Sequence, residues 1–185
     1  MRRLGDRLDV HGSALYWHFR NKQALIDAMA RAMVTPLSTE DLPDGLEWDG
    51  WLEKIANAWR QGMLSHRDGS LVLTSAQPQS ENFAFMERLL SKLVASGFSQ
   101  ADAIRGFFTL TSYVLGFVLE EQRGPTRSRA NWKKSASKNR SLFASSVAAL
   151  SDREATFEHG LHLILEGMRA HLSDDDRPAA RARTR

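Results

Sequence analysis

Residues 4–25, LGDRLDVHGSALYWHFRNKQAL, contain two short apolar edges on either side of a break. Within each edge the apolar residues stand four positions apart, as on one face of a helix; they are Leu4, Leu8, Leu15 and Phe19. Residues 9–12 interrupt this pattern, and two of them, Asp9 and Gly12, are of types that favour turns. The stretch therefore predicts two short helices joined by a tight turn, with Val10 filling the corner between them.

The second of these helices carries an unusual set of side chains. If its apolar residues face inward, the residues that face outward are Ser13, Ala14, Tyr16, Trp17 and His18. Hydroxyl, indole and imidazole groups can hydrogen-bond phosphate, an alanine can contact a thymine methyl group, and Lys22 would add a phosphate contact. Such a pair has the layout of a DNA-binding helix-turn-helix. Spacing alone leaves open a second interpretation, in which the aromatic residues form the core of a small bundle.

The composition describes an ordinary globular chain. Of the 185 residues, 42% are hydrophobic and 25% are charged, which suits one large or two small domains. There is no run of 18 apolar residues and no signal-peptide pattern, so we expect a cytoplasmic protein without a membrane partner. The absence of cysteine excludes disulfides, thiolate metal sites and cysteine-based catalysis.

The charges are segregated along the chain, although the formal net charge is only +3. Residues 1–34 carry six Arg and Lys against three Asp, and residues 35–122 carry six against twelve acidic residues. Residues 123–140 carry seven basic side chains and no acid, and they predict a surface loop. A basic N-terminal segment followed by an acidic central segment is the pattern expected when the N-terminal segment binds a polyanion.

Apolar residues recur at three- and four-residue steps through most of the chain, which predicts an all-α protein. The predicted helices cover residues 1–8, 12–19, 22–34, 48–65, 69–74, 80–96, 99–122, 140–149 and 152–172. Asp68 and Ser99 are predicted helix N-caps. Residues 173–185 predict a disordered tail.

Four stretches of the chain resemble one family. LGDRLDVHGSALYWHFRNKQALIDAMA (residues 4–30) resembles the helix-turn-helix and linker helix of the tetracycline-repressor (TetR) family of transcription regulators. LSHRDGS (64–70), ASGFSQADA (95–103) and YVLGFVLEEQ (113–122) are similar to the ligand-binding body of its tetracycline-repressor branch. The resemblance implies a DNA-binding domain at residues 1–34 and a ligand-binding and dimerisation domain at 35–172. It also implies a homodimeric repressor that a small molecule releases from a palindromic operator.

The resemblance assigns DNA contacts to eight positions: Arg2, Gly12, Ser13, Ala14, Tyr16, Trp17, His18 and Lys22. Gly12 has no side chain where the tetracycline repressor reads a base, so the operator sequence should differ. Asp9 occupies a turn position where family members often have glycine, and aspartate tolerates the left-handed conformation better than most residues.

The family's DNA-binding domain has one further helix ahead of the two predicted in residues 1–19. Three explanations stay open: Met1 is an internal methionine, the sequence has been shortened, or the protein lacks that helix and binds DNA poorly. Without that helix, the apolar edges would lose much of the surface they pack against. The alternative function is therefore a truncated homologue that binds ligand and dimerises without binding DNA.

The resemblance places the ligand site at nine positions: Ile55, Trp59, Leu73, Gln77, Met86, Leu89, Phe107, Thr111 and Glu120. Leu73 stands where tetracycline-binding members carry a histidine that ligates the drug's magnesium, and Gln77 stands at an arginine position. Because leucine supplies no metal ligand, we expect a flat, largely apolar ligand in place of a magnesium–tetracycline chelate. Core packing is the alternative role for each apolar position.

Apolar stripes on the two predicted helices at 99–122 and 152–172 suggest how the chain would dimerise. The stripes consist of Phe107, Leu110, Val114, Phe117, Leu161, Ile164, Leu165 and Met168. A single small domain would leave part of these apolar stripes exposed to solvent, so the stripes predict a two-fold, four-helix interface. Gly116, Gly160 and Gly167 would permit close approach of the helices.

Enzymatic chemistry has little support in the sequence. Glu158, His159, His162 and Glu166 recur at helical three- and four-residue steps, so a helical-bundle metalloenzyme is a further alternative. Two histidines without a clear third ligand also suit a solvent-facing or dimer-facing pair. There is no phosphate-binding glycine loop and no convincing pairing of a nucleophile with a base. We expect a protein that is not an enzyme and needs no metal and no cofactor.

Overall fold

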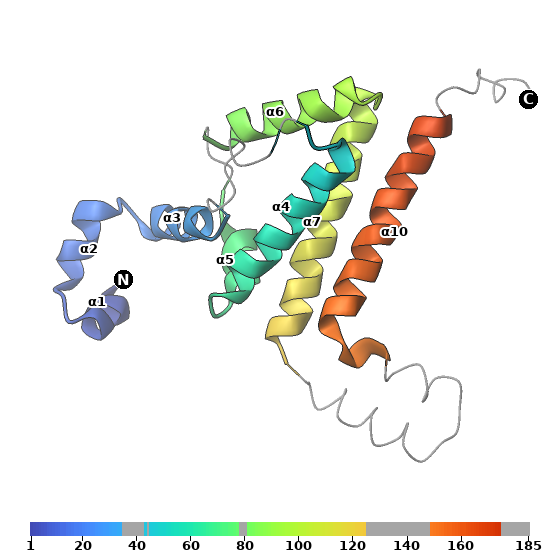
Figure 1. The fold of residues 1–185 in the computed structure, drawn as a ribbon. Coiled ribbons are helices and arrows are strands. Elements are labelled where there is room, and N and C mark those ends of the chain that lie inside the picture. The colour runs from blue at the N-terminus through green and yellow to red at the C-terminus, as the bar shows by residue number, and fades with distance from the viewer. Residues whose placement is uncertain (35–42, 44, 78–80, 125–148, 175–185) are drawn as a thin grey trace, which may run out of the picture.

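The computed structural model describes residues 1–34, 43, 45–77, 81–124 and 149–174. All described elements are helices, which confirms the predicted all-α class (Figure 1). The elements are α1 (Arg2–Leu8), α2 (Gly12–His18), α3 (Lys22–Val34), α4 (Trp48–Leu64), α5 (Gly69–Ser75), α6 (Glu81–Ala95), α7 (Gln100–Gln122), the 3-10 turn η2 (Ala149–Ser151) and α10 (Arg153–Asp174).

The observed helices follow the predicted ranges closely, with differences at their ends only. The predicted tail begins too early, because α10 continues through Asp174. Almost all of the predicted helix at 140–149 and of the predicted basic loop at 123–140 lies outside the described residues. Ser99 caps α7 as predicted, since its Oγ accepts a hydrogen bond from the Asp102 amide at 3.1 Å.

Helices α1 and α2 form the predicted pair around a tight turn. Asp9 ends α1 in the left-handed conformation, with φ of 54°, and the Val10 amide donates to the Gly5 carbonyl at 3.1 Å. Leu15 is buried. The prediction that Val10 fills the corner is wrong, because Val10 is exposed, as is Leu8. Two helices of seven residues each are too short to enclose the corner between them.

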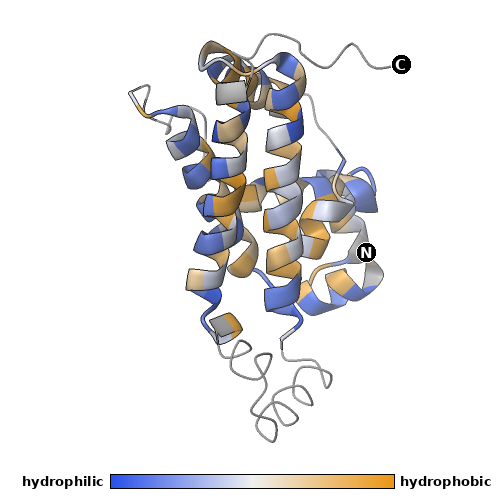
Figure 2. Ribbon diagram, turned by 90° about the vertical axis from the view of Figure 1, so that its right-hand side faces the viewer, coloured by the Kyte–Doolittle hydropathy of each residue, from blue (hydrophilic) through white to orange (hydrophobic). Residues whose placement is uncertain are grey.

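Helices α4, α5, α6, α7 and α10 are called the body below. Helix α7 is its central helix and contacts the other four. By length and composition it would also suit a membrane span, a test that the core helix of a bundle passes as well. The largest fully buried apolar side chains are Leu52, Ile55, Met63, Leu89, Leu93, Leu110, Val114, Val118 and Phe157. Figure 2 shows hydrophobic and hydrophilic residues on different sides of the long helices. Burial of one side of each helix therefore sets their packing.

The apolar stripes predicted to face a second subunit lie inside the body instead. All of these residues are buried except Phe117 and Ile164, which are half-buried. The prediction was wrong because α4 and α6 also pack on α7, which covers its stripe without a partner. Gly160 likewise serves packing within the chain, since a Cβ there would overlap the side chain of Tyr113. The large apolar residues left exposed on these two helices are Ile104, Phe108 and Leu163.

A buried arginine ties three helices of the body together. Arg60 on α4 donates from Nε and Nη2 to the two carboxylate oxygens of Glu121 on α7, each at 3.0 Å. Its Nη1 donates to Glu154 on α10 at 2.6 Å, and its guanidinium carbon lies 4.6 Å from the ring centroid of Phe157. The hydrogen bonds to Glu121 raise the pKa of Arg60 above its ordinary value, so the charge persists in the core.

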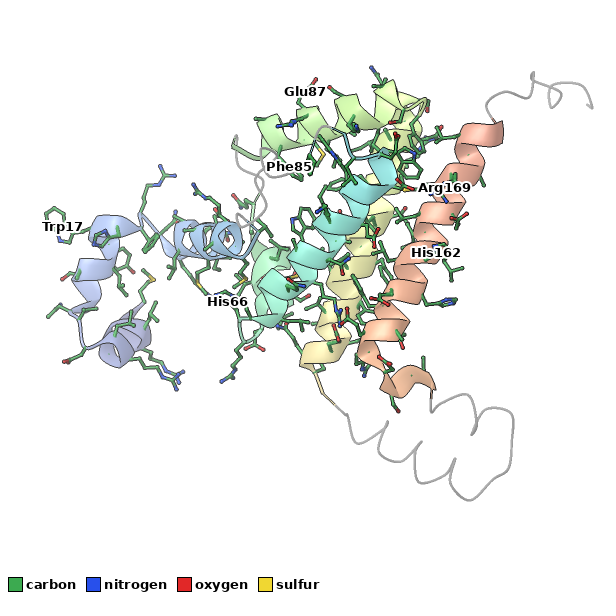
Figure 3. All side chains as sticks on the ribbon, viewed as in Figure 1. Trp17, His66, Phe85, Glu87, His162 and Arg169 are labelled. Atoms are coloured by element: carbon green, nitrogen blue, oxygen red, sulfur yellow. The ribbon has the colours of Figure 1, made fainter. Side chains whose placement is uncertain are left out.

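The opposite end of α4 is tied to the opposite end of α10. Arg169 on α10 pairs with Asp49 on α4 and with Glu166, and its guanidinium lies 5.9 Å from the ring centroid of Trp48. Figure 3 labels Arg169 on α10, near the upper end of α4. Helices α4 and α10 are therefore antiparallel and joined by ion pairs at both ends.

We expect Arg60→Ala to lower the free energy of unfolding by about 3–5 kcal/mol, because it leaves the Glu121 carboxylate buried without its partner. Urea denaturation followed by circular dichroism measures the loss. The control is Arg105→Ala, whose ion pair with Asp102 is at the surface, with the Arg105 side chain 76% exposed. Such pairs contribute about 0–1 kcal/mol. Equal losses in both variants would contradict the role assigned to Arg60.

Candidate functional site

The predicted DNA contacts on α2 form an exposed face at one end of the molecule. Trp17 is 88% exposed and Tyr16 is 55% exposed, and Figure 3 shows Trp17 far from the body. The remaining described contacts are Ser13, His18 and Lys22, which are exposed, and Ala14, which is half-buried. The side chain of Arg2 and the exposure of Gly12 lie outside the described part of the structure. The exposure of Tyr16 and Trp17 contradicts the alternative in which they form a core.

One residue of this face was not among the predicted contacts. His11 occupies the N-cap position of α2 with an extended backbone, and its Nδ1 lies 3.2 Å from Ser13 Oγ. It is exposed and directly precedes the residues expected to meet base edges. Its place at the start of the second predicted helix was the signal available in the sequence.

The predicted ligand residues include an aromatic contact between helices of the body. The ring of Trp59 on α4 lies 5.8 Å from that of Phe107 on α7, edge to face, and 6.3 Å from that of Phe85 on α6. Phe85 was missed, although it directly precedes the predicted Met86; Figure 3 labels it on α6. Ile55 and Leu89 are fully buried in the core, whereas Trp59 and Met86 are half-buried against it. Trp59, Phe85 and Phe107 are called the aromatic cluster below.

The remaining predicted ligand residues on α5 and α7 differ in their exposure and in their contacts. Glu120 is exposed and pairs with Arg123 at 3.5 Å. It follows Thr111 by nine residues, which is about 13 Å along a helix. Thr111 Oγ1 donates to the Phe107 carbonyl at 2.9 Å, so its hydroxyl hydrogen is already engaged. Leu73 on α5 is half-buried and packs against the core.

Helix α5 connects the body to the helices that carry the predicted DNA contacts, through polar contacts with α3. Gln23 Nε2 on α3 donates to the Ser75 carbonyl and to Asp27 Oδ1, both at 2.9 Å. The Gln77 amide donates to Asp27 Oδ1 at 2.9 Å. This last hydrogen bond is the main cause that lowers the pKa of Asp27, followed by the one from Gln23. Predicted ligand residue Gln77 therefore touches α3 with its backbone.

The end of α3 packs closely against α4. A Cβ at Gly62 on α4 would overlap the Met33 carbonyl oxygen, so only glycine permits this approach. Helix α3 is thus held near its start by α5 and near its end by α4. Because α3 follows α2 after three residues, these two contacts set the position of the exposed face of α2.

The candidate metal ligands do not gather into a site. Glu158, His159, His162 and Glu166 are all exposed on α10. Within the described residues, no group of three or more His, Cys, Asp or Glu side chains is placed to hold a metal ion. The arrangement therefore gives no support to the metalloenzyme alternative.

Two family descriptions match the chain. Residues 41–172 match "Tetracyclin repressor-like, C-terminal domain", and residues 1–29 match "Bacterial regulatory proteins, tetR family". The chain is 34% identical over 172 residues to the class A tetracycline repressor protein from transposon 1721 of Escherichia coli, which covers 90% of this chain and 79% of that relative.

Solved structures give the same result. A possible TetR family transcriptional regulator from Streptomyces coelicolor A3(2) superposes with a TM-score of 0.78 and 31% identity, covering 91% of this chain and 88% of that one. TetR (class A) in complex with 5a,6-anhydrotetracycline and magnesium superposes with a TM-score of 0.68 and 32% identity, covering 92% and 86%. The chain therefore belongs to the TetR family of transcription regulators.

Proposed function

We propose that this protein is a ligand-responsive repressor that binds a palindromic operator as a homodimer and releases it when a small, largely apolar molecule binds to the body. The observation that carries the proposal is the hydrogen-bonded contact between α5 and α3 at Gln23, Asp27 and Gln77. A displacement of α5 would pass through this contact to the exposed face of α2. The protein would act in the cytoplasm, where its operator lies.

The chemistry of α2 supports the DNA-binding part. Tyr16, His18 and Lys22 offer exposed hydrogen-bond donors at one end of the molecule, and residues 1–34 carry an excess of positive charge. Such groups bind phosphate and sugar and fix the register of a protein on a duplex, while the start of the helix meets base edges.

The residues of the body favour an apolar ligand. One solved relative holds anhydrotetracycline with magnesium. In this chain Leu73, at the position that resemblance assigns to a magnesium ligand, has no atom that coordinates a metal. The aromatic cluster offers flat apolar surfaces, and burial of a charged chelate against them would need compensating partners.

The exposed apolar residues of α7 and α10 support a homodimer. Ile104 and Phe108 stand one turn apart on α7, and Leu163 is exposed on α10. A Cβ at Gly116 or Gly167 would meet open space, so both helices leave room for a neighbour. A second copy of this chain would cover this surface, which replaces the buried stripes predicted from the sequence.

A second candidate is a homologue that dimerises and binds ligand but does not bind DNA. The exposure of Leu8 and Val10 favours it, since α1 and α2 alone cover little apolar surface. Weak packing would leave α2 poorly held for binding in the major groove.

Selection from a pool of random DNA duplexes distinguishes the two candidates. We expect a palindrome to be enriched and its affinity to fall as salt rises, because basic side chains release counterions from phosphate. Tyr16→Ala should weaken binding of the selected duplex by about 1–3 kcal/mol, measured by fluorescence anisotropy. The control is Phe83→Ala, which removes an aromatic side chain that is 64% exposed on α6. If no palindrome is enriched, the first candidate is refuted.

Calorimetric titration tests the nature of the ligand. We expect 2-naphthol, a flat and largely apolar probe, to bind, and Trp59→Ala to weaken its binding by about 1–2 kcal/mol through loss of aromatic contacts. The control is Trp17→Ala, because Trp17 is exposed on α2, far from the aromatic cluster. Micromolar binding of tetracycline with magnesium, abolished by a chelator, would refute the proposal of an apolar ligand.

Sedimentation equilibrium tests the dimer. Phe108 is 71% exposed, and we expect Phe108→Glu to weaken dimerisation by about 2 kcal/mol or more, because it places a charge in an apolar interface. Phe83→Glu, the same change at an exposed residue of α6, should leave the dimer intact. A native chain that is monomeric at micromolar concentration would rule out the homodimer.

A further inference from the structure

The corner between α4 and α5 is closed more tightly than its sequence suggests. Asp68 adopts the left-handed conformation, with φ of 59°. A Cβ at Gly69 would overlap the Met63 carbonyl oxygen. Asp68 is the N-cap residue of α5, as predicted, but its carboxylate makes no capping hydrogen bond and accepts from Arg67 Nε at 3.2 Å instead. The first amides of α5 therefore need another acceptor.

A side chain from the end of α7 supplies it. Gln122 Oε1 accepts from the Ser70 amide at 3.1 Å. Its Nε2 donates to the carbonyls of Met63 at 2.9 Å and His66 at 2.8 Å, which lie at the end of α4 and in the corner. One amide group thus satisfies the start of α5 and the end of α4 together. Gln122 is half-buried, so water does not freely replace these bonds.

Ser70 adds a second link to α7. It is buried, and its Oγ donates to the Leu115 carbonyl at 2.8 Å. The start of α5 is therefore bonded to α7 through both the backbone and the side chain of Ser70. At the other end of α5, the Ser75 carbonyl accepts from Gln23 of α3, and two residues farther along the chain the Gln77 amide donates to Asp27 of α3. Helix α5 has seven residues and is hydrogen-bonded beyond itself at both ends, so a displacement at one end reaches the other.

We propose that Gln122 is a positioning residue that fixes the start of α5 on α7 and thereby sets the position of α3 relative to the body. Its consequence for DNA binding rests on the proposed function, whereas its effect on α5 and α3 does not. Loss of the amide would free the corner, let α5 shift relative to α7, and weaken the contact of α5 with Gln23 and Asp27.

Hydrogen exchange of the full chain, resolved by NMR for single amides, tests this. We expect Gln122→Ala to speed exchange of the Ser70 amide by about tenfold or more, since that amide loses its acceptor. The decisive amide is that of Gln77, which lies two residues beyond the end of α5 and donates to Asp27 Oδ1. It should also exchange several-fold faster, while amides in the middle of α10 stay unchanged. The control is Gln100→Ala, which removes an exposed glutamine at the other end of α7.

Each other outcome overturns the proposal. Faster exchange at Ser70 alone would make Gln122 a local cap, and uniformly faster exchange including α10 would make it a general stabiliser. If Gln122→Ala does not fold, Gln122→Glu gives the test. An ionised carboxylate cannot donate to the Met63 and His66 carbonyls, whereas a protonated carboxyl group can donate to one of them. As the pH is lowered, the Gln77 amide of Gln122→Glu should therefore become better protected relative to that of the native chain. If the difference in protection between the two proteins does not change with pH, the proposal is overturned. Failure of the chain to bind any duplex would refute the proposed function alone.

Discussion

The arrangement of the body depends on the burial of one positive charge. The guanidinium of Arg60 has almost no access to water, so protein groups must match its charge and its donors. Its carboxylate partners come from residues 61 and 94 positions later in the chain, on two different helices. The two-point contact with Glu121 also fixes direction, because a guanidinium and a carboxylate meet in one plane. Apolar stripes allow α4, α7 and α10 several rotations about their axes, and this ion pair selects one of them.

Helices α1 and α2, which carry most of the predicted DNA contacts, lack a comparable constraint. Within the described side chains of α1 and α2, Leu15 is the only large apolar one that is buried. The position of α2 therefore comes from α3, whose Met33 carbonyl rests against Gly62 and whose Asp27 accepts from the Gln77 amide. Few buried contacts make a segment easy to displace, and a regulator needs its reading end to move at low free-energy cost. The sparse packing of α1 and α2 and the dense packing of the body thus match the proposed roles of DNA binding and ligand binding.

The sequence predicted local features well because their causes lie within a few residues. The ends of the helices, the left-handed Asp9 and the Ser99 cap all follow from neighbouring residue types. The failures share a different cause. The burial of Val10 and the exposure of the apolar stripe on α7 were both predicted from local sequence alone. Other helices decide the outcome in each case: none covers Val10, whereas neighbouring helices cover the stripe of α7. Gln122 bonds residues 52 to 59 positions earlier, a pairing that no local pattern indicates.

The candidate site was predictable in a similar way. Exposure of Tyr16 and Trp17 followed from the inward direction of Leu15 on the same short helix. For the ligand residues, resemblance identified Trp59 and Phe107, which the structure places in contact, but also Glu120, which pairs at the surface. Residues on one long helix can match a family pattern and still lie far apart, because each nine-residue step adds about 13 Å.

A ligand can shift this protein only through a difference in its affinity for two arrangements of the body. The aromatic cluster already packs on itself, so a flat molecule that bound there, as proposed, would gain contact mainly by separating α4 from α6. Helix α4 resists that separation, because Arg60, next to Trp59, is held by α7 and α10. Under the proposed function, the displacement would then fall on α6 and on α5, where Leu73 packs against the core. With its start fixed by Gln122, α5 would swing at its other end, where it meets Gln23 and Asp27. Such a swing needs steric pressure and no metal-bridged bond, so a leucine at position 73 is compatible with regulation by an apolar ligand.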